Sequence, residues 1–225
     1  PLDPVRYITN LSSGKMGYAL AAAAHHRGAR VTLISGPCTL AAPQVDEIIF
    51  VRTALQMYEA VMERYAKATL IIKAAAVADY RPAVRQDQKI KKKNEDLTVK
   101  LERNPDIIHE IGAKKEDRIL VGFAMESEHL VEHAIGKMVA KNMDFIVAND
   151  VTKEGAGFQG DTNIITILDR DGEMQELPLM DKMEAAGVIL DKVREIRERR
   201  RSQPEQKTES LLSLWKTAGG KNRLQ

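Results

Sequence analysis

The residues of this chain best suited to chemistry form a short polar run, Asn10 to Gly17, directly ahead of an alanine-rich stretch. Small polar residues and glycines before a helix leave backbone N–H groups unpaired, and the helix dipole favours negative charge there. Ser12 and Ser13 add hydroxyl groups, and Gly14 would let a phosphate approach the backbone. The run matches neither GxxxxGKS/T, because Met16 follows the lysine, nor GxGxxG. It predicts a phosphate site, with a plain helix cap as the structural alternative.

A second candidate site follows an apolar run at the segment Ala74 to Asp79. Ligands of open α/β sheets bind at the carboxyl ends of strands, so we expect Asp79 to hold Mg²⁺ or a ligand hydroxyl, with a turn cap as the alternative. The lysines Lys89 and 91–93 follow. Their pattern alone indicates a solvated face, and the functional alternative is a mobile lid that brings an ammonium group to a phosphate.

Two further features lie in the second half of the chain. Asn104 is expected to cap a helix with Pro105 in its first turn, and a ligand contact is equally compatible with this pattern. Lys137 and Lys141 are four residues apart on a predicted helix, so both ammonium groups reach one side, as surface lysines or as a clamp for a triphosphate. The histidines show no metal-ligand cluster.

These candidate residues require a scaffold, and helix-like and strand-like runs alternate along the chain. Continuous apolar strands separated by helices predict an α/β fold with a doubly wound, Rossmann-like, mainly parallel sheet covered on both faces. Two segments, 83–103 and 163–177, interrupt the alternation and are expected to form hairpins. The expected strands are 30–35, 48–51, 69–73, 119–123 and 145–148, and the expected helices are 14–27, 53–67, 127–141 and 181–200.

Composition limits the possible functions. The 225 residues suffice for one sizeable domain, and a net charge of +2 argues against general nucleic-acid binding. Cys38 is the single cysteine, so no intrachain disulfide can form, which suits a reducing cytosol. No apolar run is long enough to span a membrane, and no secretion signal is visible, so we expect a cytoplasmic protein. The polar stretch 201–225 is expected to be a disordered tail.

Taken in order, several segments resemble phosphopantothenoylcysteine synthetase, the phosphopantothenate–cysteine ligase of coenzyme A synthesis. The resemblance is to the bacterial CTP-using type, commonly the C-terminal half of a multifunctional protein. The matching pieces are DPVRYITNLSSGKMG (3–17), VTLISGP (31–37), AAAVADYRP (74–82), KIKKK (89–93), NPDII (104–108), VGFAMES (121–127), KMVAKNMDFIVAND (137–150) and GFQGDTN (157–163).

The resemblance implies an activity: CTP activates a carboxylate to an acyl-cytidylate with release of pyrophosphate, and cysteine then displaces CMP. It implies that Asn10 stabilises the acyl-cytidylate and that Lys89, on a flap, offsets phosphate charge. Arg6 would bind the substrate, and Asp79 would bind the nucleotide directly or through Mg²⁺. The nucleotide contacts implied are Ser12, Ser13, Gly14, Ala75, Asp79, Pro105, Asp106, Ile107, Ile108, Phe123, Lys137 and Lys141.

The resemblance also implies an organisation. Residues 1–200 would form the ligase domain of a homodimer, with the 83–103 and 163–177 strands in a small dimerisation sheet. A flavin-dependent decarboxylase domain with FMN would be a fused partner if it precedes this chain. Family members usually begin with a further inner strand and a Gly-Gly-Thr loop, both absent here, and the chain starts at Pro1 without a methionine. We therefore expect an N-terminally truncated domain with reduced activity.

Two other functions remain compatible with the pattern. An NAD(P)-dependent reductase would share the Rossmann-like alternation, but GxGxxG and a Tyr-x-x-x-Lys pair are absent: Met62 follows Tyr58 at that spacing, and Val84 follows Tyr80. An inactive fragment that only dimerises is the third possibility. Release of pyrophosphate that depends on CTP separates the ligase from both.

Overall fold

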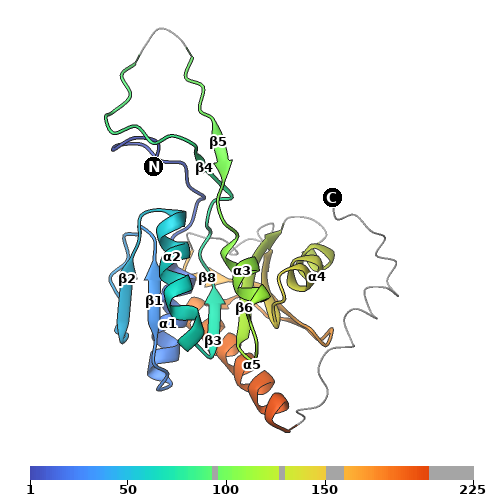
Figure 1. Cartoon of the computed structure of the whole chain (residues 1–225). Helices are drawn as coiled ribbons and strands as arrows, with labels where there is room; N and C mark the ends of the chain where they lie inside the picture. Colours follow the sequence, from blue (N-terminus) through green and yellow to red (C-terminus); the bar gives the residue numbers. More distant parts are fainter. Residues whose placement is uncertain (93–95, 127–129, 151–159, 203–225) are drawn as a thin grey trace.

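The computed structural model describes residues 1–92, 96–126, 130–150 and 160–202, so the predicted tail lies outside the description from residue 203 on. Helices and strands alternate in the predicted order (Figure 1). The helices are α1 (Lys15–His26), α2 (Ala54–Arg64) with a 3-10 turn η1 (Tyr65–Lys67), α3 (Ile107–Ala113), α4 (Leu130–Ala140) and α5 (Lys182–Ser202). None of the helices in these ranges is long and apolar enough to cross a membrane.

The strands form one large sheet and three two-stranded sheets. The large sheet has the order β10-β9-β7-β6-β3, in which β3, β6 and β7 are parallel, while β9 and β10 add an antiparallel edge. β1 and β2 form a separate parallel pair, so β1 and β3 each keep one edge unpaired among the described residues. The strands are β1 (Thr32–Ser35), β2 (Glu47–Phe50), β3 (Leu70–Lys73), β4 (Tyr80–Pro82), β5 (Leu101–Arg103), β6 (Ile119–Glu126), β7 (Phe145–Asp150), β8 (Thr162–Asn163), β9 (Ile165–Asp169), β10 (Met174–Glu176) and β11 (Met180–Asp181).

Apolar residues on both faces of β7 explain why the sheet is covered twice. Side chains alternate along a strand, and here both sets are buried. Phe145 and Val147 pack in one cluster with α1 and α5, whereas Ile146 and Ala148 pack in another with α2, α3 and α4. The doubly wound α/β fold with a mainly parallel core is therefore confirmed.

The hairpin predicted at 163–177 belongs to the large sheet. β9 pairs with β7 in the register Phe145↔Asp169 to Asn149↔Ile165, and β10 pairs with β9. Ile165 and Ile167 are each 1% exposed, so burial of these side chains favours this position. Within one chain the hairpin therefore pairs with β7, and a small dimerisation sheet formed with residues 83–103 stays a prediction.

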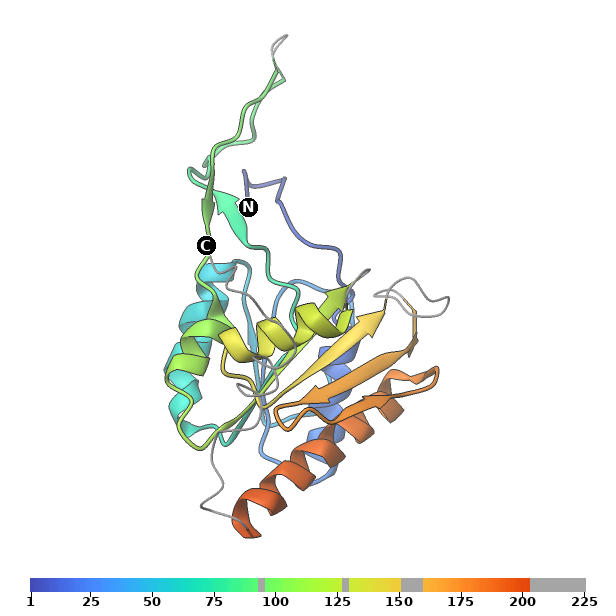
Figure 2. The same cartoon turned by 90° about the vertical axis from the view of Figure 1, so that its right-hand side faces the viewer.

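The interrupting segment 83–103 is a long protrusion. β4 and β5 pair over three residues only, from Tyr80↔Arg103 to Pro82↔Leu101. We call residues 80–92 and 96–103 the arm. Figures 1 and 2 show it projecting away from the helices and sheets, with the N-terminal end of the chain beside it.

The start of α3 differs from the expectation. The cap is Asp106, whose Oδ1 accepts the N–H of His109 at 3.2 Å, and the helix begins at Ile107. Asn104 instead donates its amide N–H to the Ala78 carbonyl at 2.8 Å. A carboxylate can only accept a hydrogen bond, whereas an amide can also donate one. This explains why Asp106 caps the helix while Asn104 donates to the loop after β3.

Candidate active site

The start of α1 lies between the carboxyl ends of β1 and β3. Gly14 is its N-cap with φ 77°, a conformation that favours glycine. A Cβ on Gly14 would lie 3.6 Å from that of Cys38, which follows β1. On the other side, a Cβ on Gly17 would lie 3.7 Å from that of Ala74, which follows β3. The predicted phosphate site therefore lies at a carboxyl edge, where a helix N-terminus and two strand ends meet.

Both serines of the run turn toward the helix start. The Oγ of Ser12 accepts the N–H of Gly14, and the Oγ of Ser13 accepts the N–H of Lys15, each at 3.4 Å. These contacts are long for hydrogen bonds, so the hydroxyl groups hold the N–H groups weakly. An anion at this position can therefore compete for the same donors.

Three separate segments converge at this edge. Asn10 donates its amide N–H to the Val77 carbonyl at 3.4 Å, which joins the polar run to the loop after β3. The N–H of Asn104 donates to the Asp79 carbonyl at 2.8 Å, which joins the same loop to the start of α3. The structure thus brings Asn10, Asp79 and the segment that precedes Ile107 into one region, and the Asp79 side chain is exposed there.

Lysines surround the loop after β3. Lys141 pairs with Asp106 at 2.8 Å, and Lys73 donates to the Ala75 carbonyl at 3.3 Å. Burial lowers the pKa of Lys73, and Lys141 and Lys137 lower it further, against the opposite effect of Asp106 and Asp79. Lys73 is thus a candidate that the sequence analysis missed. It ends an apolar strand, and only the folded chain shows which charges surround it.

Three predicted nucleotide contacts, Ile107, Ile108 and Phe123, do not share a surface. Ile107 and Ile108 are 3% and 4% exposed and pack in the cluster of α2, α3 and α4. Phe123 packs against the cluster of α1 and α5, on the opposite face of the sheet. Among the described residues these side chains do not form one pocket wall, so a nucleotide near Pro105 would meet backbone rather than isoleucine side chains.

Arg6, in the N-terminal segment, contacts the arm through a buried carboxylate, Asp3. Asp3 is 1% exposed and accepts the N–H groups of Val5 and Arg6 at 2.8 Å and that of Ile90 at 3.1 Å. Arg6 pairs with Asp3 at 3.1 Å and donates to the Ile90 carbonyl at 3.3 Å. This clasp fixes Arg6 beside Lys89. The arm, which contains Lys89, projects away from the helices and sheets (Figure 1).

No group of three or more histidine, cysteine, aspartate or glutamate side chains able to hold a metal ion occurs in the described ranges. Mg²⁺ is often bound through one or two carboxylates together with substrate phosphates, so a single carboxylate beside a phosphate site suits it. Asp79 is exposed beside the lysines and has the required chemistry.

Comparisons with known proteins give the family of this chain and agree with its fold. Residues 1–196 match the family described as DNA/pantothenate metabolism flavoprotein C-terminal domain, and the chain belongs to this family. It is 50% identical over 193 residues to the coenzyme A biosynthesis bifunctional protein CoaBC of Bacillus subtilis, covering 85% of this chain and 48% of that protein. The chain thus spans about half the length of the curated relatives it matches.

Solved structures show the same fold. The crystal structure of the C-terminal domain of a CoaBC protein is 41% identical with a TM-score of 0.75, and the match covers 88% of this chain and 89% of that one. A mutant Cab2 in complex with phosphopantothenate-cysteine has a TM-score of 0.67 over 89% of this chain and 85% of that one. At 14% identity this second likeness shows the fold alone.

Proposed function

We propose that the chain is a phosphopantothenate–cysteine ligase that uses CTP. The observation that carries the proposal is the convergence of an open helix start, an exposed carboxylate and three lysines at one carboxyl edge, in a chain of the CoaBC C-terminal family. Such an edge suits a polyphosphate. It offers little acid–base machinery, which suits a reaction governed by positioning and charge.

In the first half-reaction a carboxylate oxygen of phosphopantothenate attacks the α-phosphorus of CTP. The bond between the α-phosphorus and its bridging oxygen breaks, and pyrophosphate leaves with the electron pair. The N–H groups at the start of α1 would bind the α-phosphate, and Lys137 and Lys141 would hold the leaving phosphates. Mg²⁺, when bound at Asp79, would neutralise part of the triphosphate charge.

In the second half-reaction the amine of cysteine attacks the acyl carbon, the bond to the cytidylate oxygen breaks, and CMP leaves. In this proposal Asn10 donates a hydrogen bond to the acyl-cytidylate, and the contact of its amide with the loop after β3 supports this role. We expect Asn10→Asp to form the intermediate and to slow its use by cysteine. Unchanged turnover in this variant would exclude that role.

Lys89 acts from the arm and Arg6 from the N-terminal segment that contacts it, and the exposed surface of the arm supports a homodimer. It and the neighbouring N-terminal segment expose large apolar side chains, among them Tyr7 at 70% and Val84 at 67%. Such a surface marks a contact site in a soluble protein. A dimer would carry the arm of one protomer toward its partner. Sedimentation should give twice the mass of one chain, and a concentration-independent monomer would contradict this part of the proposal.

The decisive experiment mixes the chain with phosphopantothenate, CTP, Mg²⁺ and cysteine and follows pyrophosphate, with ATP as the matched nucleotide control. We expect pyrophosphate release with CTP, and we expect Lys89→Gln to abolish it. If the printed chain and the same chain carrying whatever precedes Pro1 in its gene both release none, the ligase proposal is refuted. A fused decarboxylase domain with FMN and a cytoplasmic location remain predictions.

A further inference from the structure

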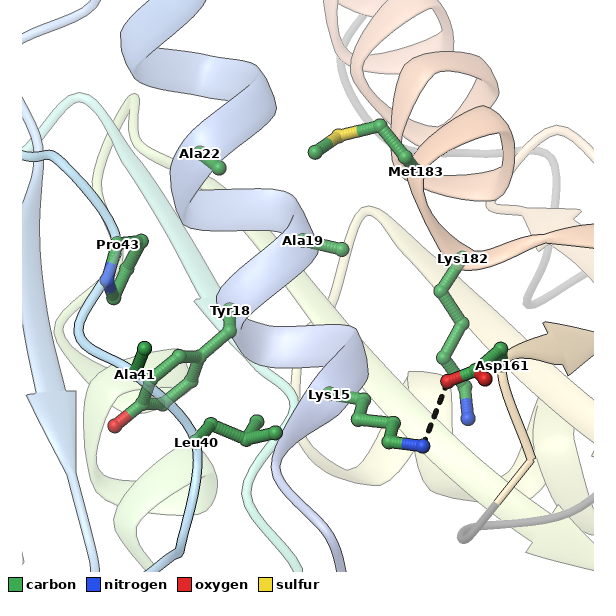
Figure 3. Close-up of a pocket in the computed structure, with 10 residues that line it drawn as sticks. All are labelled: Lys15, Tyr18, Ala19, Ala22, Leu40, Ala41, Pro43, Asp161, Lys182 and Met183. Carbon is green, nitrogen blue, oxygen red and sulfur yellow. Dashed lines mark hydrogen bonds and ion pairs between the residues drawn. The ribbon is translucent and has the colours of Figure 1, made fainter.

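A groove with a volume of about 370 Å³ lies beside the start of α1, between the loop after β1 and the start of α5 (Figure 3). Leu40 forms part of its wall, and its Cδ1 lies 3.8 Å from the position of a Cβ on Gly14. The groove therefore borders the predicted phosphate site. None of the residues named above as nucleotide contacts lines this groove.

Charges of both signs gather at one end of the groove. Lys15 pairs with Asp161 at 2.7 Å, and Figure 3 shows the head groups of Lys15 and Lys182 pointing toward the Asp161 carboxylate. Lys182 is 7% exposed and donates to the Gly160 carbonyl. This end therefore offers two ammonium groups, one carboxylate and one carbonyl oxygen. The remaining lining is mainly apolar and consists of Tyr18, Ala19, Ala22, Leu40, Ala41, Pro43 and Met183.

A free amino acid carries the complementary pattern, a carboxylate next to an ammonium group on one carbon. We infer that this groove binds cysteine, with its α-carboxylate at Lys182 and Lys15 and its amine at Asp161. The inference rests on the proposed function, because cysteine is the second substrate of that reaction. Charge-assisted hydrogen bonds of this kind give both affinity and orientation.

The location suits the chemistry of the second half-reaction. The amine must first lose one proton to solvent, and the Asp161 carboxylate that would hold it is 88% exposed, so solvent can reach it. The new C–N bond then forms at the acyl carbon while CMP leaves with the electron pair of the broken C–O bond, and the nitrogen releases its second proton to solvent to give the amide. Cysteine held in the groove lies beside Gly14. Its amine therefore approaches an acyl-phosphate bound at the start of α1 from the groove.

The structural alternative is that the Lys15–Asp161 pair only ties residues 160–163 to α1. The two roles differ in substrate discrimination. Cysteamine has the thiol and the amine of cysteine but no carboxylate, so a site that reads the carboxylate must distinguish the two. A tie between two segments affects both substrates equally.

The test compares kcat/KM for cysteine and for cysteamine after the acyl-cytidylate has formed. We expect Lys182→Met to lower the value for cysteine by about tenfold or more while that for cysteamine is unchanged. Lys15→Met, at a more exposed position, should act in the same direction. Asp161→Asn should raise KM for both substrates. Asp171→Asn, at an exposed carboxylate in the β9–β10 turn, is the matched control.

Pyrophosphate release in the absence of cysteine reports the first half-reaction and the integrity of the fold. If neither the wild-type chain nor the same chain carrying whatever precedes Pro1 in its gene releases any, the proposed ligase fails. If release is normal in the variants and the ratio of cysteine to cysteamine stays at the wild-type value in both lysine variants, the groove does not bind cysteine and the inference is overturned.

Discussion

Lys115 is a buried lysine, 5% exposed, at the end of the sheet opposite to the candidate site. Its ammonium group lies 2.7 Å from Asp144 and 3.0 Å from the Asn142 carbonyl. Asp144 also accepts the N–H of Leu120 at 2.7 Å and pairs with Arg200 of α5. One carboxylate therefore serves two cations and a backbone donor, and the cluster joins α5 to the start of β6 and β7.

Burial lowers the pKa of Lys115 from 10.5 to about 8, because desolvation outweighs the attraction of Asp144 and because Arg170 and Arg200 add repulsion. Between these two pH values the unfolded chain binds more protons than the folded one, so the free energy of unfolding rises with pH. The difference between the two pKa values corresponds to on the order of 3 kcal/mol in the free energy of unfolding, and this stability is gained mainly between pH 8 and 10.5.

Urea denaturation of the wild type and of Lys115→Met across this pH range measures the effect. Other groups titrate in both proteins, so the informative quantity is the difference in the free energy of unfolding between them. We expect that difference to shift in favour of the wild type by on the order of 3 kcal/mol as the pH rises. A flat or falling difference would refute the reasoning. Arg200→Gln should move the shift to higher pH, because it removes one repelling cation.

Three other perturbations test the structure. In Gly112→Ala the new Cβ would lie 2.1 Å from the Lys141 carbonyl oxygen, so we expect a loss of about 1–3 kcal/mol in urea denaturation. Asp3→Asn should loosen the clasp at the arm, because it removes the charge that holds three N–H groups, and limited proteolysis should then cut the arm faster. If the ligase proposal holds, Lys73→Met should raise KM for CTP about tenfold, whereas Lys67→Met, at an exposed position near the other end of β3, should not.

Local signals in the sequence predicted the alternating elements well. Continuous apolar runs such as that around Phe145 identify strands buried on both faces. Thr53, the first residue of the helix expected over 53–67, caps α2, and its hydroxyl accepts the Gln56 N–H at 3.1 Å. The position of Asn10 and Asp79 at one edge also follows from the order of the elements, because parallel strands place their carboxyl ends together.

Features that depend on contacts distant in sequence could not be predicted in this way. The sequence around Asn104 is typical of a helix cap, but in the structure its amide donates to the Ala78 carbonyl instead. The 163–177 hairpin has a clear turn, but only the space left beside β7 decides which sheet it joins. The charges that surround Lys73 include Lys141 and Asp106, which lie far along the chain, so only the fold shows that Lys73 is a candidate site residue.

The parallel strands lie in two separate sheets, because β1 and β3 do not pair with each other in the part of the chain that the structure describes. This separation affects local unfolding. β1 and β2 pair only with each other among the described residues, and their side chains are mostly half-buried, whereas Val121, Phe145 and Val147 in β6 and β7 are fully buried. Regions with fewer buried contacts open at a lower free energy. Amide protons of β1 and β2 should therefore exchange with solvent well before those of β6 and β7. The wall that carries Cys38 and Leu40 thus follows a pair of strands that opens more easily than β6 and β7, and a ligand bound at the start of α1 would slow the exchange of that pair.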